Sequence, residues 1–146
     1  MKMLRGVILI CCAALMGAAP RPADRYAEGQ VWEYRNRPQD VGSLLKIQRI
    51  EDGENLGRIY HISVIGIVLR SVRGHELQHS PVSRATLDAS VTRLSSAKRD
   101  WPDAGPGITQ WREAKGGVFT ITVAAIIDLI DQAVPSDAPV SDNDRT

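Results

Sequence analysis

A long run of aliphatic and β-branched residues, from Gly57 to Arg70, constrains the fold of this chain more than any other segment. Its density of Ile and Val is typical of a strand, and Gly66 within it indicates a bulge or a close backbone contact. Two further strand-like segments precede it, at residues 30–35 and 43–50, and breaks rich in Pro, Gly, Asp or Asn separate the three. The first half of the chain therefore predicts a three-stranded antiparallel meander.

The second half of the chain changes to helical spacing. Ser80 and Pro81 resemble an N-cap followed by a first helical residue, and apolar residues then recur at intervals of three or four. A loop is expected at 101–107, because two prolines and two glycines fall within seven residues. The expected elements are helices at 81–97, 110–114 and 123–134, the last capped by Thr120 or Thr122, and a short fourth strand within 118–122.

Strands followed by helices predict an α+β domain, with two or three helices packed over one face of a small antiparallel sheet. The chain has 146 residues, of which 43% are hydrophobic and 24% are charged, as in ordinary globular proteins. Its length suits one domain, which we expect at residues 30–134. Residues 135–146 are polar, acidic and short of apolar side chains, so they are expected to form a disordered tail.

The N-terminal residues 1–19 have the layout of a signal peptide. Lys2 and Arg5 precede an apolar run that extends from Gly6 to Ala19, and a polar, proline-containing stretch follows it. The run has 14 residues, fewer than the roughly 20 that a membrane-spanning helix needs. A cleavable export signal is therefore favoured over a permanent anchor, and the protein is expected in the periplasm or outside the cell. The cleavage position stays open.

Both cysteines of the chain, Cys11 and Cys12, lie inside this apolar run. Lipidation of one of them is an alternative, but a longer apolar stretch and small residues directly before the cysteine would be expected in that case. If the run is removed after export, the mature protein has no cysteine. Disulfides and thiolate metal sites are then excluded, and stability must come from burial of apolar residues.

The charge pattern argues against a nucleic-acid partner. The net charge is +1, and the arginines are spread along the chain without forming a basic block. Contact with a membrane is expected only in passing, through the signal peptide.

Residues 75–79 read His-Glu-Leu-Gln-His, the H-E-x-x-H text of zinc metalloproteases. In those enzymes a helix brings both histidines to one zinc ion, and the glutamate polarises the bound water. Gly74 and Pro81 flank the text and would interrupt that helix, and no histidine follows His79 as a third ligand. A polar loop is the favoured interpretation, with no metal or other cofactor, and a small zinc hydrolase is kept as the alternative.

A histidine within an apolar strand, His61, is the second candidate. Its strand is expected near the one that carries Trp32 and Tyr34, and an imidazole beside two aromatic rings would suit a binding groove. The alternative is that His61 is a buried, hydrogen-bonded core residue and that the aromatic rings only supply core area. Trp111 is interpreted in the same way, as helix packing first and partner contact second.

The chain resembles a set of small uncharacterised bacterial proteins over most of the segment after the signal. The resemblance is carried by GQVWEYRNRP at residues 29–38, HISV at 61–64, HSPVS at 79–83 and WREAKGGVFTI at 111–121. In that set the histidine that matches His79 recurs without the rest of the H-E-x-x-H text. The resemblance implies no activity, and an export signal is a departure from it.

The sequence thus favours an exported, non-enzymatic module that binds a protein or a small ligand, with Trp32, Tyr34, His61 and His79 as the candidate binding residues. The nucleophile-elbow, phosphate-loop and dinucleotide-binding motifs are absent from the sequence, which lowers the expectation of an enzyme without excluding one. Besides the zinc hydrolase, a purely structural protein of the cell envelope is a third hypothesis.

Overall fold

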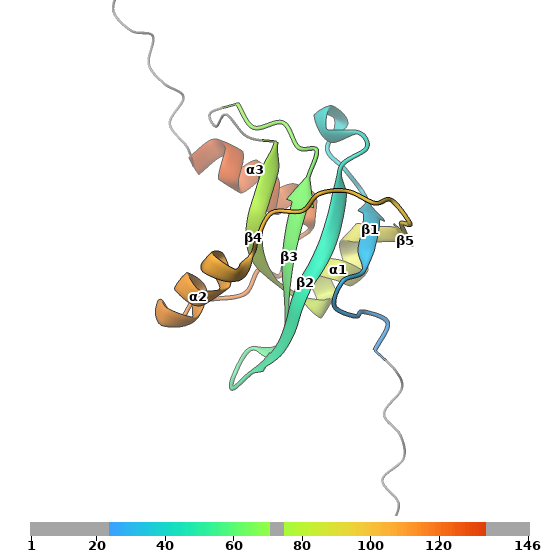
Figure 1. The fold of residues 1–146 in the computed structure, drawn as a ribbon. Coiled ribbons are helices and arrows are strands. Elements are labelled where there is room, and N and C mark those ends of the chain that lie inside the picture. The colour runs from blue at the N-terminus through green and yellow to red at the C-terminus, as the bar shows by residue number, and fades with distance from the viewer. Residues whose placement is uncertain (1–23, 71–74, 134–146) are drawn as a thin grey trace, which may run out of the picture.

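Five strands form one antiparallel sheet in the computed structural model, which describes residues 24–70 and 75–133. The strands are β1 (Val31–Tyr34), β2 (Leu44–Gly53), β3 (Gly57–Ile65), β4 (Glu76–Ser83) and β5 (Val91–Leu94). Their order across the sheet is β4-β3-β2-β1-β5, so β4 and β5 are its two edges (Figure 1). The predicted meander is confirmed as β1, β2 and β3, but the sheet has more strands than the sequence predicts.

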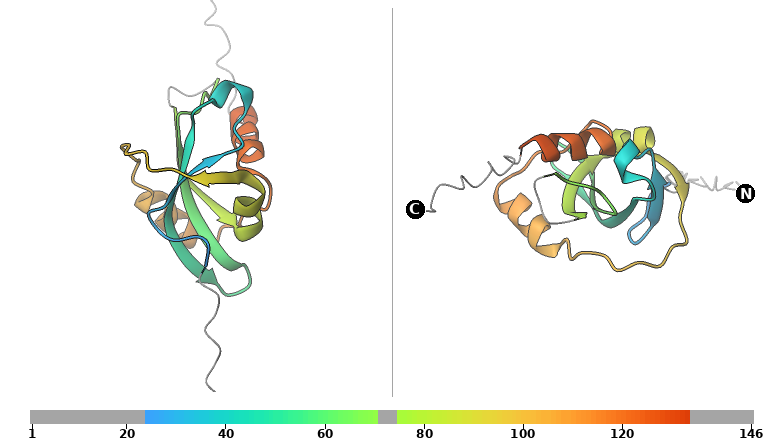
Figure 2. Two further views of the ribbon diagram at one scale, coloured as in Figure 1. Left: turned by 90° about the vertical axis from the view of Figure 1, so that its right-hand side faces the viewer. Right: turned by 90° about the horizontal axis from the view of Figure 1, so that it is seen from above.

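Helices cover both faces of this sheet, whereas the sequence predicts helices over one face. The helices α1 (Arg84–Ser90) and α3 (Val123–Ala133) lie on one face, and α2 (Gly105–Glu113) lies on the other (Figures 1 and 2). Because β5 is at the edge opposite β4, the segment 95–104 must cross the sheet to reach α2. The α+β class is confirmed, and α2 supplies the second layer.

The main core lies between the sheet and the helices α1 and α3. Trp32, Leu45 and Val64 are paired across three adjacent strands and are all buried on this face. The helices add Leu87, Val123, Ile126 and Ile127 to the same cluster. Each such side chain stabilises the fold by about 1.5–3 kcal/mol on full burial. The described residues thus contain a continuous apolar core between the sheet and these two helices.

The helix predicted at 81–97 is confirmed only at residues 84–90, as α1, and is wrong at both ends. Its first residues belong to β4, where Pro81 pairs with His61, and proline is tolerated there because β4 is an edge strand. The N-cap is Ser83, whose Oγ accepts a hydrogen bond from the Thr86 N–H at 3.1 Å. After seven residues of α1 the chain turns at Val91 into β5. Sheet pairing at both ends therefore outweighs the apolar spacing that suggests one continuous helix.

Two other predictions change in detail. The helix α2 begins at Gly105, inside the expected loop, because Pro106 suits a first helical turn. The expected fourth strand at 118–122 is reduced to a single parallel bridge between Phe119 and Val82. The last helix is confirmed as α3.

Single residues end β3 and begin α3. Gly66 has a φ of +76°, so it ends β3 in a left-handed conformation that suits glycine. Thr122 accepts a hydrogen bond from the Ala125 N–H at 3.3 Å, and it is the cap of α3. Of the two predicted caps, Thr122 is confirmed.

Two predicted features lie outside the described residues: the signal peptide at 1–19 and the tail at 135–146. The strand that the sequence predicts from Gly57 to Arg70 is shorter in the structure, because β3 ends at Ile65 and Gly66 follows it in a left-handed conformation. Within the described residues, no helix combines the length and the apolar character that a membrane crossing requires.

Candidate functional site

Two histidines, His61 on β3 and His79 on β4, meet on the face of the sheet that α2 covers. Nδ1 of His61 lies 2.8 Å from Nε2 of His79, the ring centres are 5.1 Å apart and the ring planes differ by 23°. Two imidazoles that are nearly coplanar at this distance share one hydrogen bond edge to edge. His61 is 0% exposed, whereas His79 is half-buried and forms part of a groove.

A bulge in β2 brings Glu51 to this face. Ile47 pairs with Ile62, but the next pair is Arg49 with His61, so β2 contains one residue more than β3 at this point. Side chains alternate between the faces of a strand, and an extra residue therefore moves all later side chains to the opposite face. Without the bulge Glu51 would point toward the main core.

A second bulge, in β4, does the same for His79. Leu77 pairs with Val64 and Ser80 pairs with Ile62, so three steps along β4 match two steps along β3. Leu77 packs on the main core, and His79 lies on the opposite face beside Pro81. The two bulges together place a carboxylate and a second imidazole around His61.

Glu51 lies between the histidine pair and helix α2. Its Oε1 is 3.4 Å from Nε2 of His61, and its carboxylate accepts hydrogen bonds from the guanidinium of Arg112 on α2. Arg112 holds the pKa of Glu51 below its usual value, so the carboxylate is ionised at neutral pH.

Burial lowers the pKa of both histidines. The pKa of His79 is lowered to about 4 by burial and by the neighbouring His61. The pKa of His61 is lowered by burial, against the opposing attraction of Glu51. Both rings are therefore neutral at pH 7, and each carries one N–H.

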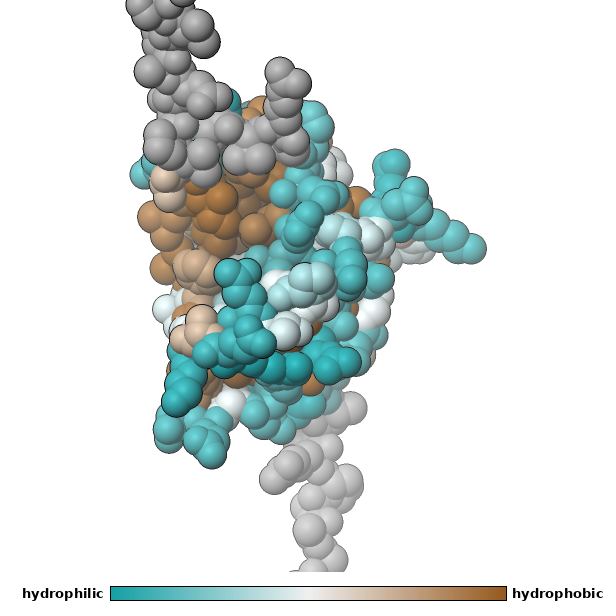
Figure 3. Space-filling model, turned by 60° about the vertical axis from the view of Figure 1, so that its left-hand side comes forward, coloured by the Kyte–Doolittle hydropathy of each residue, from teal (hydrophilic) through white to brown (hydrophobic). Residues whose placement is uncertain are grey.

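A groove of about 580 Å³ runs across the outer edge of β4, between α2 and α3. Its lining is mainly apolar, and Figure 3 shows a brown, apolar surface on this side of the molecule. We call it the β4 groove. It is lined by Leu69, Leu77, His79, Pro81, Trp111 and Ile130, among others.

Two residues of α2 shape this groove. The ring of Trp111 meets that of His61 edge to face at 5.0 Å, and its Nε1 donates to the carbonyl of Gly117 at 2.8 Å. Gly107 lies against His79, where a Cβ atom would be only 2.7 Å from the His79 Cβ. Glycine at 107 therefore lets α2 approach β4 closely enough to form one wall of the groove.

The backbone of β4 is partly paired on its outer side. The Phe119 N–H donates to the Pro81 carbonyl at 3.0 Å, and the Ser83 N–H donates to the Phe119 carbonyl at 2.9 Å. At residues 76–80 no described residue outside β3 hydrogen-bonds to the β4 backbone. This part of the edge borders the β4 groove.

The structure brings together two of the four predicted binding residues. His61 and His79 are in contact, but Trp32 and Tyr34 are each only 4% exposed and lie in the main core, on the opposite face of the sheet. Trp32 packs edge to face against Tyr26, and the Tyr34 hydroxyl is hydrogen-bonded to Ser43 at 2.7 Å. The aromatic wall beside His61 is supplied by Trp111 instead.

The H-E-x-x-H segment is neither the predicted polar loop nor the helix that zinc binding requires, because Glu76–Ser83 form a strand. Four residues along a strand separate His75 from His79 by roughly 13 Å, too far for one metal ion. His75 is exposed, and its Nδ1 lies 3.1 Å from the Ile67 carbonyl. Among the described residues no group of three His, Cys, Asp or Glu could hold a metal ion.

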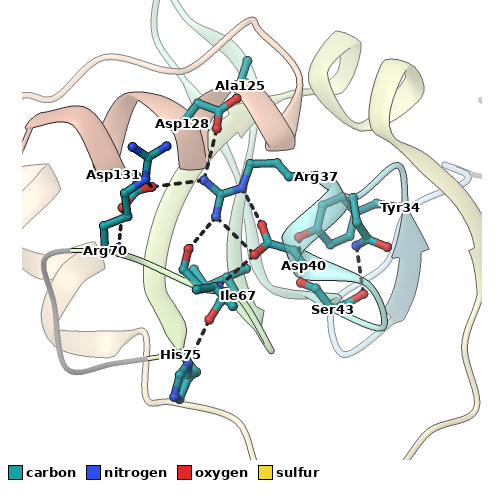
Figure 4. Close-up of polar contacts among 12 residues, drawn as sticks. Tyr34, Arg37, Asp40, Ser43, Ile67, Arg70, His75, Ala125, Asp128 and Asp131 are labelled. Atoms are coloured by element: carbon teal, nitrogen blue, oxygen red, sulfur yellow. Dashed lines mark hydrogen bonds and ion pairs between the residues drawn. The ribbon is translucent and has the colours of Figure 1, made fainter.

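A separate polar cluster surrounds Arg37 (Figure 4). Its guanidinium donates to Asp40 in a bidentate pair, to Asp128 at 3.1 Å and to the Val68 carbonyl at 2.8 Å, and it lies 3.6 Å from Asp131. Asp40 is 0% exposed and also accepts from the Val68 N–H at 2.8 Å. Because these groups satisfy one another, the cluster is a structural tie between η1 (Pro38–Asp40) and α3.

Sequence reasoning missed Glu51 and Gly107 as parts of the site. Glu51 is expected in a turn, and only the bulge in β2 directs it to His61. Gly107 reads as a loop glycine, and its contact with His79 depends on where α2 docks. Comparisons with protein-family models, with curated proteins and with solved structures find no match for this chain.

Proposed function

We propose that this protein is a non-enzymatic binding module that takes an extended peptide segment of a partner protein along the outer edge of β4. The observation that carries this function is the β4 backbone at residues 76–80, which has no hydrogen-bond partner outside β3 among the described residues and borders an apolar groove. An added strand would obtain main-chain hydrogen bonds from the edge and side-chain pockets from the groove.

The chain itself supports an extended occupant. Phe119 already adds to the same edge in parallel orientation, through hydrogen bonds to Pro81 and Ser83. A peptide at residues 76–80 would continue the edge that this segment begins. The lining by Leu77, Trp111 and Ile130 favours apolar side chains in the peptide.

The surroundings of the histidines favour binding over catalysis. No described serine, threonine or cysteine hydrogen-bonds to His61 or His79, so the described residues place no side-chain nucleophile in contact with either ring. We propose also that the partner is met outside the cytoplasm, because residues 1–19 have the sequence of an export signal.

Selection from a library of random peptides on the immobilised full chain tests this function. The selected peptides should shift the backbone amide resonances of residues 76–80 in NMR spectra. Ala114 is exposed and lines the groove, so Ala114→Arg should weaken binding roughly tenfold or more by obstructing the site.

Thr109→Arg is the matched control, because it adds the same charge to an exposed position of α2 outside the groove. It should leave the affinity nearly unchanged. Peptides that bind both variants equally, or that shift amides of β5 at the opposite edge, would show that the β4 groove is not the site.

A further inference from the structure

The β4 groove contains Nδ1 of His79, and the residues around this ring decide whether Nδ1 is a hydrogen-bond donor or an acceptor. His79 Nε2 is engaged with His61, and no described residue hydrogen-bonds to His79 Nδ1. A neutral imidazole carries a proton on one nitrogen only. His79 Nδ1 is therefore a donor or an acceptor, depending on which ring owns the proton between Nδ1 of His61 and Nε2 of His79.

Glu51 determines, through His61, which of the two rings carries the shared proton. Nε2 of His61 is fully buried and has Oε1 of Glu51 at 3.4 Å. At this distance the contact is longer than a normal hydrogen bond, but an ionised carboxylate still attracts an N–H and repels a lone pair. The proton of His61 is therefore on Nε2, and its Nδ1 accepts a hydrogen bond from Nε2–H of His79.

The charged groups around Glu51, His61 and His79 favour the same positions of the two protons. Arg112 of α2 is bound to the carboxylate of Glu51 and holds it ionised, and both Arg112 and Arg49 of β2 oppose a second proton on His61. On β4 the neighbour is His79 itself, which burial keeps neutral. Because the single proton of His79 is on Nε2 and is donated to Nδ1 of His61, His79 has a lone pair on Nδ1.

We propose that Glu51, His61 and His79 form a relay across β2, β3 and β4, in which the charge of Glu51 orients the proton of His61 and a hydrogen bond joins His61 to His79. The relay makes His79 Nδ1 a hydrogen-bond acceptor in the β4 groove, so that the ligand must present an N–H or O–H donor beside an apolar body. This rests on the proposed function for the nature of the ligand. The order of the protons belongs to the free protein, and it can be measured without any peptide.

Long-range ¹H–¹⁵N correlation spectra of the imidazole rings in the full chain at pH 7 test the relay. The expected result is protonated Nε2 and unprotonated Nδ1 in both histidines. In Glu51→Gln the amide oxygen should stay on Arg112 and the amide NH₂ should face His61, so both rings should move their proton to Nδ1. Glu54→Gln, at an exposed position of the same hairpin, is the control and should keep the wild-type order.

Two small ligands test the donor requirement. Indole and 1-methylindole have similar apolar bodies, but only indole has an N–H, and a hydrogen bond of ordinary net strength corresponds to roughly threefold to tenfold tighter binding. Indole should bind the β4 groove of the wild type more tightly by this factor, and the preference should disappear in Glu51→Gln.

A protonated Nδ1 in wild-type His79, or an unchanged order in Glu51→Gln, would overturn the relay even if peptides bind to β4. The expected order with equal binding of the two indoles would overturn the donor requirement. Failure of the peptide selection alone, with the expected ring protons and the indole preference, would instead reject only strand addition.

Discussion

His79 is a titratable residue that the fold keeps uncharged. Its pKa is lowered to about 4 by burial beside His61, from an ordinary value near 6.5 in an unfolded chain. Between these two values the unfolded state binds more protons than the folded state. The contribution of His79 to stability is therefore complete above pH 6.5 and is lost progressively as the pH falls toward 4.

We expect His79→Gln to reduce the stability loss between pH 7 and pH 5. Urea unfolding of the wild type should show a lower free energy of unfolding at pH 5, and the variant should lose about 1 kcal/mol less, allowing for the partial exposure of the ring. His75→Gln, at an exposed position directly before the same strand, should keep the wild-type difference. An identical difference in all three proteins would contradict the lowered pKa of His79.

Single residues show where the sequence is informative about the site. His61 and His79 can be selected as candidates because histidines are rare in this chain and one lies in an apolar strand. Their contact, and the contact with Glu51, depend on two bulges for which the sequence has no recognisable signal. Trp32 and Tyr34 are on one face of β1 as predicted, but that face is the core side.

At the scale of elements, the Arg37 cluster connects parts of the chain that are far apart in sequence. It joins η1, the segment after β3 through Val68, and α3 through Asp128 and Asp131. These contacts hold the end of α3 that carries Ile130, one wall of the β4 groove. These polar contacts thus hold the helix that forms one wall of the apolar β4 groove.

Arg37→Ala should destabilise the protein strongly. It leaves the carboxylate of Asp40 buried without its cation, and loss of one partner of a buried pair costs about 3–5 kcal/mol. Urea unfolding at pH 7 measures this cost. Arg93→Ala, which removes an exposed pair with Glu33, should unfold like the wild type. Similar unfolding of both variants would show that the Arg37 cluster does not stabilise the fold.

Elements with a local signal are predicted well. The strands β1 to β3 follow from β-branched runs between turns, and α3 follows from its apolar spacing and its threonine cap. The segment 76–94 is predicted wrongly, because α1 is short and β4 and β5 are formed by pairing with distant strands. Which face α2 covers is also decided by these pairings, which local patterns do not contain.

At the scale of the whole molecule, the apolar core lies on one face of the sheet, and the proposed binding groove lies at the β4 edge. The main core is closed by α1 and α3, whereas α2 lies over part of the other face (Figure 2). The β4 groove lies beside α2. This division follows from the crossing segment 95–104, which must span the sheet before α2 begins. The fold therefore has its apolar groove at the edge where α2 arrives.

The predicted export signal at residues 1–19 determines in which compartment the protein is expected to act. If residues 1–19 are an export signal, the mature protein loses both cysteines, and its stability rests on the apolar core. Expression of the full chain in a bacterium, followed by fractionation, should yield a periplasmic or secreted protein whose intact mass begins near residue 20. Thiol titration of the unfolded product should find no cysteine.

Ile8→Asp places a charge in the apolar run and should keep the chain in the cytoplasm, with Cys11 and Cys12 both reactive. A matched Ile121→Asp change, at an exposed position beyond the signal, should be exported and processed like the wild type. Because none of the described residues that line the β4 groove belongs to the apolar run, the retained variant should still bind the selected peptides. Wild-type protein recovered from the cytosol with Met1 and two thiols would reject export while leaving the binding function standing.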